Sequence, residues 1–554
     1  MAYPRGSEWS IWDLHVHTPA SIVQHYGDES EDTWQRFLSE LEQLPSEIHV
    51  LGINDYWFLD GYKRVREARD SGRLANIREI FPVVEFRLSM FGGTESSLKR
   101  QNLHVIFDPT LDITTIQSQF LNALEAKFTL LPERRASWSG SVTRESLVDL
   151  GRAIKTTAPP DKLADYGSDL MEGFNSLVIE HRAVYEALDR HYFAGRHLVG
   201  LGKAEWSAVR WNDQSVAAKR DLVGRVDFLF TAFQAPGAWP DSVAKMKSDK
   251  VLHKIFDCSD AHHWTNASQS ERIGNCRNWV NAAPTFSGLR HAVAEFDHRV
   301  YVGLEPGHLS NISRNPDRYI NSISVRPVTN HHSPVFDYAI DLNSQFIAVV
   351  GNKGKGKSAL LDCLGLAGGS SRTSEFAFLN TKRFLNSRNP DAKNYAATIT
   401  WRDGSQKTAR LTSVAEPASG KVRVEYLPQA FVERVCTADQ HSEAARDFES
   451  ELRKVLFSHI SDEDRAGARD FDSLLEKRTA TSEVKIRELR QELGRLVWDY
   501  LDLIEFSRKN PAHLLEAKIK EQQRAYEEAL RATESARSTL EALDAKSEAA
   551  GAVA

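Results

Sequence analysis

The sequence predicts an α/β protein: a largely parallel sheet or barrel comes first, then a second, smaller α/β unit, and finally long helices. Three observations predict this. Short apolar runs alternate with amphipathic stretches up to about residue 305, a pattern typical of βα units. A glycine-rich loop at residues 351–358 stands between an apolar run and a helix-like segment. After residue 461 charged residues dominate, with leucines at helical spacing.

Apolar runs of strand length define the first part of the chain. They cover residues 11–16, 48–53, 81–88, 103–107, 197–201, 226–231 and 251–256. Amphipathic stretches such as 32–44 and 61–70 lie between several of them, as crossover helices do. The polar segment 138–165, which contains two adjacent prolines, is interpreted as an insertion or a long loop.

Shifts in composition divide the chain into four parts. Residues 1–305 form the first domain, and a stretch rich in Pro, Asn and Ser predicts a linker over 306–335. Residues 336–461 form the second α/β unit, which begins its core with a predicted strand at 345–350. Residues 462–554 predict charged helices, interrupted near Asn510-Pro511. We interpret them as a coiled-coil arm, the alternative being a solvated helix without a partner.

Composition excludes several classes of protein. A hydrophobic content of 41% with 26% charged residues is typical of chains that bury sizeable cores, and no apolar run approaches the ~20 residues of a membrane span. The N-terminal residues lack the apolar core of a signal peptide. The four cysteines show no Cys-x-x-Cys spacing, which favours a reducing compartment. We expect a cytoplasmic protein with no membrane partner.

Two short motifs far apart in the sequence predict a metal site. Asp13, His15 and His17 alternate in one apolar run, and Asp260 and His262 follow another about 245 residues later. Side chains at i and i+2 leave the same face of a strand. Imidazole together with carboxylate is a common ligand set for first-row metals. The two motifs are therefore expected to supply two sides of one site.

Further candidate ligands stand where other strand-like runs end or begin. Asp55 follows one run, Glu85 lies in the next, and His104 lies in the run after that. In α/β barrels, functional groups gather at the C-terminal strand ends. We expect the metal ligands to be His15, His17, Asp55, Glu85, His104, Asp260 and His262, with the catalytic roles carried by Glu85, Asp260 and His262.

These residues resemble the polymerase-and-histidinol-phosphatase (PHP) family of metallophosphoesterases. The resemblance covers about residues 9–265 and implies a distorted seven-stranded βα barrel with two or three divalent ions, Mn, Zn or Fe. The family's bridging glutamate corresponds to Glu85. The other motif positions correspond to His15 and His17, the Gly52–Tyr56 segment, His104, Asp260 and His262.

The chain departs from the family pattern at one position. Tyr56 stands where many members have a histidine ligand. The alternative to a three-ion site is therefore a site that holds two ions. His25 is a candidate for an additional ligand after the first motif. His181 is a candidate for a further family histidine, although its neighbourhood is equally consistent with the start of a helix.

The glycine-rich loop predicts a phosphate site. A strand-like run, the pattern G-x-x-x-x-G-K-S and a helix-like run follow one another, which is the context of a P-loop. Backbone N–H groups of such a loop surround a phosphate at a helix N-terminus. Lys357 is expected to contact the β- and γ-phosphates and Ser358 to bind Mg²⁺. The expected ATP-binding residues are Gly351, Asn352, Gly354, Lys355, Gly356, Lys357, Ser358 and, further along, Gln429.

The segment around Gln429 resembles the Q-loop of ABC-type ATPases, including the SMC group, whose ATPase head is interrupted by a long coiled coil. No signature motif and no Walker B motif follows Ser358. The resemblance therefore implies an incomplete head: the N-terminal part of a longer protein or one half of a split pair. The expected partners are the missing C-terminal ATPase half or a second copy of the chain, in a homodimer or higher oligomer. Alone, the chain is expected to bind nucleotide weakly and to hydrolyse it poorly.

The order of a PHP domain and an SMC-like ATPase resembles the TrlF-type PHP–ATPase fusions of bacteria. This implies a metal-dependent phosphoesterase, foremost a nuclease acting on DNA or RNA, governed by ATP and serving defence or DNA processing. One alternative is a phosphomonoesterase acting on a nucleotide or small metabolite. The other is a non-catalytic, ATP-dependent DNA-binding clamp with a degenerate PHP domain.

Overall fold

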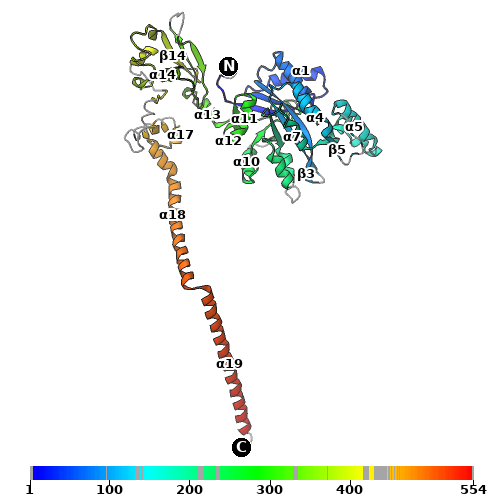
Figure 1. Ribbon diagram of the computed structural model, residues 1–554, viewed down its shortest axis with the longest axis vertical. Coiled ribbons are helices and arrows are strands. Elements are labelled where there is room, and N and C mark those ends of the chain that lie inside the picture. Colours follow the sequence, from blue (N-terminus) through cyan, green and yellow to red (C-terminus); the bar gives the residue numbers. More distant parts are fainter. Residues whose placement is uncertain are drawn as a thin grey trace. The chain divides into compact units, whose positions relative to one another are not determined.

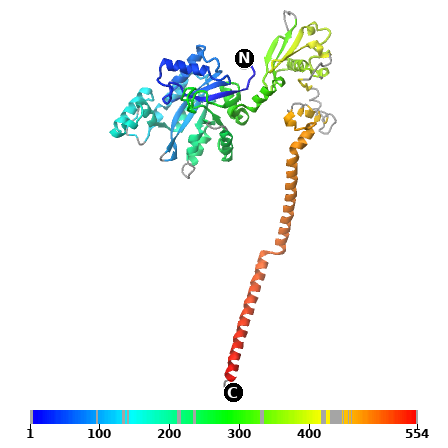
Figure 2. The same cartoon turned by 180° about the vertical axis from the view of Figure 1, so that it is seen from behind.

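The computed structural model describes residues 4–551 apart from residues 95–96, 132–133, 135, 137, 139–140, 210–215, 233–236, 329–334, 371, 416–422, 429–445, 447–448, 451, 455, 458–459 and 461. The chain divides into two compact units, Met1–Tyr426 and Leu427–Ala554. In Figure 1 the strands of the first part, up to about residue 300, are surrounded by helices. Figure 2 gives the reverse view.

The strands of the first unit form two separate sheets, and the predicted boundary near residue 305 falls between them. The larger, 11-stranded sheet has the order β11-β10-β1-β2-β3-β4-β7-β8-β9, with β6 beside β3 and β5 beside β6. Its strands are β1 (Glu8–Val16), β2 (Ile48–Tyr56), β3 (Glu79–Thr94), β4 (Ser97–Phe107), β5 (Phe128–Leu130), β6 (Leu177–Ile179), β7 (His197–Gly202), β8 (Phe228–Thr231), β9 (Ile255–Asp257), β10 (Asn278–Ala282) and β11 (Val300–Val302).

Each of the seven predicted runs contains a strand, and the parallel pairing is confirmed in part. β1, β2 and β3 run parallel to one another, as do β7, β8 and β9. β4 is antiparallel to both of its neighbours, β3 and β7. β10 and β11 add antiparallel pairs beside β1. The last predicted strand begins at Ile255 rather than at residue 251.

The large sheet curves into a nearly closed barrel, and the residues after β9 meet β1. Val16 and Ala261 form a parallel bridge, in which the amide of His17 donates to the carbonyl of Ala261 at 3.1 Å. The Asp13 carboxylate accepts a hydrogen bond from the amide of Ser259 at 3.0 Å. The strand that begins the sequence is therefore joined to the segment about 245 residues later.

Helices cover the large sheet and connect its strands. Ser30 caps α1, whose buried face carries Trp34, Phe37 and Leu41. The helices and short helical turns of this region are α1 (Glu31–Glu42), α2 (Asp60–Asp70), α3 (Ile113–Thr115), η1 (Ile116–Leu121), α4 (Asn122–Leu124), η2 (Glu125–Lys127), α5 (Arg144–Thr156), η3 (Pro160–Asp165), α6 (Asp169–Ser176), α7 (His181–Leu188), α8 (Lys203–Ala208), α9 (Val216–Gly224), α10 (Ala238–Ser248), α11 (Phe286–Ala294), α12 (Phe296–Arg299), α13 (Gly307–Arg314) and η4 (Pro316–Arg318).

Of the two interpretations of 138–165, an insertion or a long loop, the long loop is wrong, because this segment contains α5. Thr143 and Ser146 form a capping box at its start, and the buried side chains recur at helical spacing. A Cβ at Gly151 would lie 1.8 Å from the carbonyl oxygen of Asp169 on α6. The glycine thus permits a close crossing of the two helices.

The second sheet has the order β13-β12-β14-β15, and α14 packs on it through a buried cluster that includes Cys363, Leu366 and Trp401. Its elements are β12 (Ile320–Pro327), β13 (Tyr338–Asp341), α14 (Lys357–Gly368), η5 (Thr373–Glu375), η6 (Pro390–Asn394), β14 (Tyr395–Trp401), β15 (Gln406–Arg410) and η7 (Leu411–Ala415).

The predicted strand at 345–350 is not a strand. A strand requires ladder partners, and no described strand pairs with this segment. Its side chains are correspondingly open, with Phe346 94% exposed and Val350 87% exposed. The second α/β unit therefore has a helix and a sheet but lacks this predicted strand, and its strand β12 (Ile320–Pro327) lies within the predicted linker 306–335.

Long helices follow, as predicted. After the short helix α17 (Asp462–Arg465) they are α18 (Phe471–Lys509) and α19 (Ala512–Gly551), and the predicted interruption lies at Asn510-Pro511 (Figure 1). Leucines such as Leu489, Leu493 and Leu496 are 51–62% exposed, so the coiled-coil pairing stays a prediction. None of the described helices is long and apolar enough to cross a membrane.

The contact between β1 and β2 gives a test of this packing. A Cβ at Gly52 would lie 2.4 Å from the backbone oxygen of Leu14, so Gly52→Ala is expected to force the strands apart and destabilise the fold by ~1–3 kcal/mol. The midpoint of urea unfolding should fall. Gly224→Ala is the control, since no atom lies within 4 Å of its Cβ; equal midpoints for the two variants would contradict the packing.

Candidate metal centre

Five of the predicted ligands meet inside the curved sheet, from four different segments. His15 and His17 come from β1, Glu85 from β3 and His104 from β4, while Asp260 lies in the segment after β9. Glu85 and His104 are directly opposite each other in the β3–β4 ladder. All but Asp260 are buried to 5% exposure or less.

The ligand atoms form two groups that share His15. One group is His15, Glu85 and His104, and the other is His15, His17 and Asp260, with the ligand atoms of each within 4.8 Å of one another. Nε2 of His15 lies 3.1 Å from Oδ1 of Asp260 and 3.4 Å from Oε2 of Glu85. Nε2 of His104 lies 3.5 Å from Oε1 of Glu85.

These spacings and the unused nitrogens fit metal ions. Ligands bonded at about 2.0–2.2 Å to one ion lie about 3.0–3.5 Å from each other in tetrahedral or octahedral geometry. Both ring nitrogens of His104 are buried and have no hydrogen-bond partner among the described residues. A buried imidazole without a partner is costly unless something binds it, and a divalent ion between His104 and Glu85 would do so.

Two asparagine side chains that the sequence patterns did not single out hold Glu85 from both sides. Asn54 Nδ2 donates to Oε2 of Glu85 at 2.8 Å, and Asn102 Nδ2 donates to Oε1 at 2.6 Å. The amide of Asn102 in turn donates to Oε2 of Glu205 at 2.9 Å. Such partners orient metal ligands. Asn102 precedes His104 by two residues on β4, so its side chain lies on the same face of the strand. This alternation is the sequence pattern that could have identified Asn102.

The charges in the cluster are unevenly distributed between the two histidines of β1. Burial disfavours a charged imidazole, but the Asp260 and Glu85 carboxylates outweigh it and raise the pKa of His15 well above its usual range. Burial, with a smaller electrostatic contribution from the neighbouring His262, lowers the pKa of His17 to about 3. Burial also opposes ionisation of Glu85, yet His104 and His15 hold the pKa of Glu85 well below its usual range.

Asp55 and His262 lie beside the cluster, outside the two ligand groups. The Asp55 carboxylate accepts hydrogen bonds from the amide and the hydroxyl of Thr18, and burial raises the pKa of Asp55 to about 7. His262 packs against His17 with ring centroids 4.0 Å apart, and its Nδ1 lies 2.7 Å from the carbonyl oxygen of Asp260. Their roles as ligands stay predictions.

The alternative ligands are also placed. Tyr56 stacks on His17 with ring centroids 5.0 Å apart. His25 stacks on His263, away from the two ligand groups, and His181 is the first residue of α7, where its Nε2 lies 3.4 Å from Asp221. Asp13 does not join the cluster, although it alternates with His15; its carboxylate bonds the amide of Ser259, and burial raises its pKa to about 6.

The predicted phosphate loop lies before α14, at the end of the exposed segment described above. Gly354 and Gly356 have φ angles of 82° and 88°, which favour glycine. Lys357 Nζ donates to the carbonyls of Gly351 and Asn352 at 2.6 and 3.0 Å. The remaining predicted residues are Lys355, which is exposed, Ser358 on the first turn of α14, and Gln429, which lies outside the described residues.

A scan against protein-family models finds no match to this chain, and a search of curated proteins finds none either. The site itself must therefore carry the functional argument.

Because His15 belongs to both ligand groups, its removal should affect both. We expect His15→Ala to lose most of the bound divalent metal after incubation with Mn²⁺, Zn²⁺ or Fe²⁺, and His104→Ala to lose only the share held with Glu85. Metal content by inductively coupled plasma mass spectrometry measures this. The exposed His191 provides the control variant His191→Ala. Metal-free wild-type protein, or full retention in His15→Ala, would contradict the site.

Proposed function

We propose that this chain is a metal-dependent phosphoesterase that hydrolyses phosphodiester bonds of nucleic acid. The observation that carries the proposal is the buried cluster in which His15 is shared by two ligand groups, each with a carboxylate. Two adjacent divalent ions are the usual solution for in-line displacement at phosphorus. The resemblance to the PHP family, made on the same residues, agrees with this proposal.

The roles of the residues follow from their charges and partners. Divalent ions held by the cluster supply the acidity and positive charge that phosphodiester hydrolysis needs. Glu85 would contact both ligand groups, since its Oε1 lies 3.5 Å from His104 and its Oε2 lies 3.4 Å from His15 and 3.5 Å from His17. Asn54 and Asn102 fix that carboxylate, while His17 binds as a neutral ligand that adds no negative charge against the substrate.

Arginine side chains beside the cluster support a phosphate substrate. Arg87 follows Glu85 by two residues on β3 and therefore shares its face of the strand. Its guanidinium lies over Phe174, with its Cζ atom 3.8 Å from the ring centroid, and donates to Asn175. Within the part of the chain that the structure describes, Nε of Arg87 and Nη1 of Arg100 are buried without hydrogen-bond partners. Such unused donors suit the oxygens of a phosphodiester.

We also propose that residues 346–358 belong to an ATP-binding, SMC-like head that another protein segment completes. Two observations support this. Lys357 donates to the carbonyls of Gly351 and Asn352 in the glycine-rich loop, and the apolar run before the loop is exposed. A strand of Phe346 and its neighbours would be covered once further strands pair with it. We propose a C-terminal ATPase half or a second copy of the chain as the completing segment, with ATP and Mg²⁺ as the ligand.

Hydrolysis of a substrate panel tests the first proposal. With Mn²⁺, the full chain is expected to cut labelled DNA or RNA and to leave a chromogenic phosphomonoester intact. Glu85→Gln should abolish cutting, and Asn102→Ala should lower the rate about 10–100-fold because it frees Glu85. The exposed Glu67 supplies the control Glu67→Gln. Cleavage of the monoester alone would favour the phosphomonoesterase, and no cleavage together with metal-free protein would favour the non-catalytic clamp.

Nucleotide binding tests the second proposal. The full chain should bind ATP–Mg²⁺ weakly, and Lys357→Ala should weaken binding at least about tenfold, the effect of losing one charge-assisted contact. Calorimetric titration measures this, with Lys382→Ala at an exposed position as the control. Equal affinities for the two variants would contradict a nucleotide site at this loop.

A further inference from the structure

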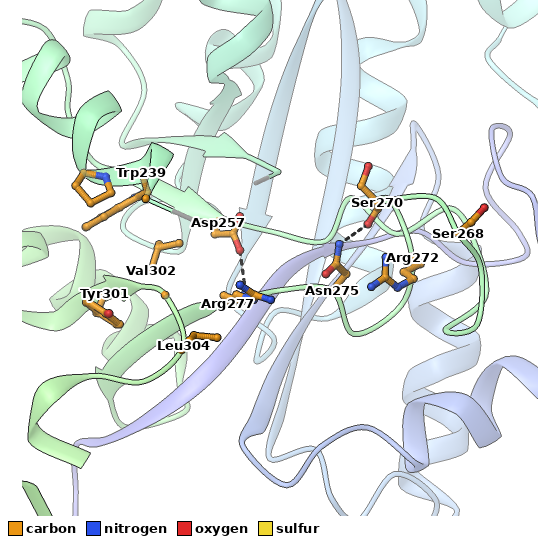
Figure 3. Close-up of a pocket in the computed structure, with 13 residues that line it drawn as sticks. Trp239, Asp257, Ser268, Ser270, Arg272, Asn275, Arg277, Tyr301, Val302 and Leu304 are labelled. Carbon is orange, nitrogen blue, oxygen red and sulfur yellow. Dashed lines mark hydrogen bonds between the residues drawn. The ribbon is translucent and has the colours of Figure 1, made fainter. Parts of the chain in front are cut away.

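A pocket of about 740 Å³ lies beside β9, β10 and β11. It is lined by the start of α10, by Asp257 on β9, by the connection from β9 to β10 and by the end of β11 (Figure 3). None of the metal ligands lines it. Its size is that of pockets that enclose small organic ligands.

One end of the pocket is aromatic and apolar. Trp239, Tyr301, Val302 and Leu304 gather there (Figure 3). The indole N–H of Trp239 donates to the carbonyl of Ile255 at 2.8 Å, which fixes the ring. Tyr301 remains 36% exposed and Leu304 78% exposed. A fixed indole beside an open phenol is a suitable surface for stacking a planar base.

The rest of the pocket is cationic. Arg277 lies near its middle, while Arg272 lies with Asn275 and Ser270 toward the other end (Figure 3). Within the described part of the chain, neither guanidinium pairs with a carboxylate at 4.0 Å or less; Nη1 of Arg272 donates to the carbonyl of Gln269. The Asp257 carboxylate accepts the backbone amide of Arg277 at 2.8 Å. The guanidinium groups of Arg272 and Arg277 and the single carboxylate of Asp257 together give the pocket lining a net positive charge.

We propose that this pocket binds a nucleoside phosphate, with the base against Trp239 and Tyr301 and the phosphate on Arg272 and Arg277. The planar guanidinium group of arginine can donate two hydrogen bonds to phosphate oxygens. The aromatic end can stack on any of the bases, because every base has a π-face. The ligand is a free nucleotide or one nucleotide of a strand. The proposal depends neither on the metal centre nor on the phosphate loop.

Calorimetric titration of the full chain tests this site apart from the others. The protein carries Lys357→Ala and is kept in chelator, so that neither the phosphate loop nor the metal centre contributes. The probes are the four nucleoside monophosphates, inorganic phosphate and a ten-nucleotide single strand. We expect a nucleotide or the strand to bind, more tightly than inorganic phosphate. Strand binding without mononucleotide binding identifies the strand as the source.

Variants assign the binding to the pocket. Arg272→Ala and Arg277→Ala should each weaken it about tenfold or more, and Tyr301→Ala about fivefold or more through lost stacking. Arg182→Ala, at an exposed position of α7 outside the pocket, should bind like the parent, and circular dichroism checks that each variant folds. Absence of binding by every nucleotide probe, or equal affinity in the Arg272, Arg277 and Arg182 variants, would overturn the proposal.

Discussion

The closure of the large sheet between β1 and the segment after β9 is the constraint on which the metal centre depends. Asp13 accepts the amide of Ser259, and Val16 bridges Ala261. These contacts bring Asp260 against His15, whose Nε2 lies 3.1 Å away. Asp13 is buried, and burial raises its pKa to about 6. Its carboxylate nevertheless accepts the hydrogen bond that joins β1 to the segment after β9. Without the closure, the second ligand group would lose its carboxylate.

Within the closed sheet, the position of Glu85 is determined by its neighbours on both strands. Asn54 on β2 and Asn102 on β4 each donate to one of its oxygens. A carboxylate with one donor on each oxygen has little freedom to rotate, so its orientation is set before any ion binds. Both histidines of β1 approach the two carboxylates, but Nε2 of His15 lies closer to Asp260 (3.1 Å) than Nε2 of His17 does (3.7 Å), and burial together with His262 lowers the pKa of His17.

The sequence predicted much of the site from two simple patterns. Polar and apolar residues alternate along β1, which places His15 and His17 on one face, and the positions of the apolar runs locate the strands that carry the other ligands. It did not identify Asn54 and Asn102, since amides are not first-choice metal ligands and their role depends on which strands are neighbours. Asp13 shows the limit of alternation: it shares a run with His15 yet bonds a backbone amide. Helix α5 was missed because polar residues and nearby prolines obscured its buried positions, which only packing against α6 explains.

The error at 345–350 has a different physical origin. An apolar run of this length predicts a strand only where neighbouring strands supply ladder partners and cover its side chains, and Phe346 at 94% exposure has neither. The candidate metal centre, by contrast, draws four of its five residues from strands of one sheet, and the fifth, Asp260, from the segment that follows β9. The candidate metal site is thus formed within one described sheet and its closing segment, whereas the residues before the glycine-rich loop have no ladder partner among the described strands. Hydrolysis at the candidate metal site is therefore expected to depend less on a second protein segment than nucleotide binding at the glycine-rich loop does.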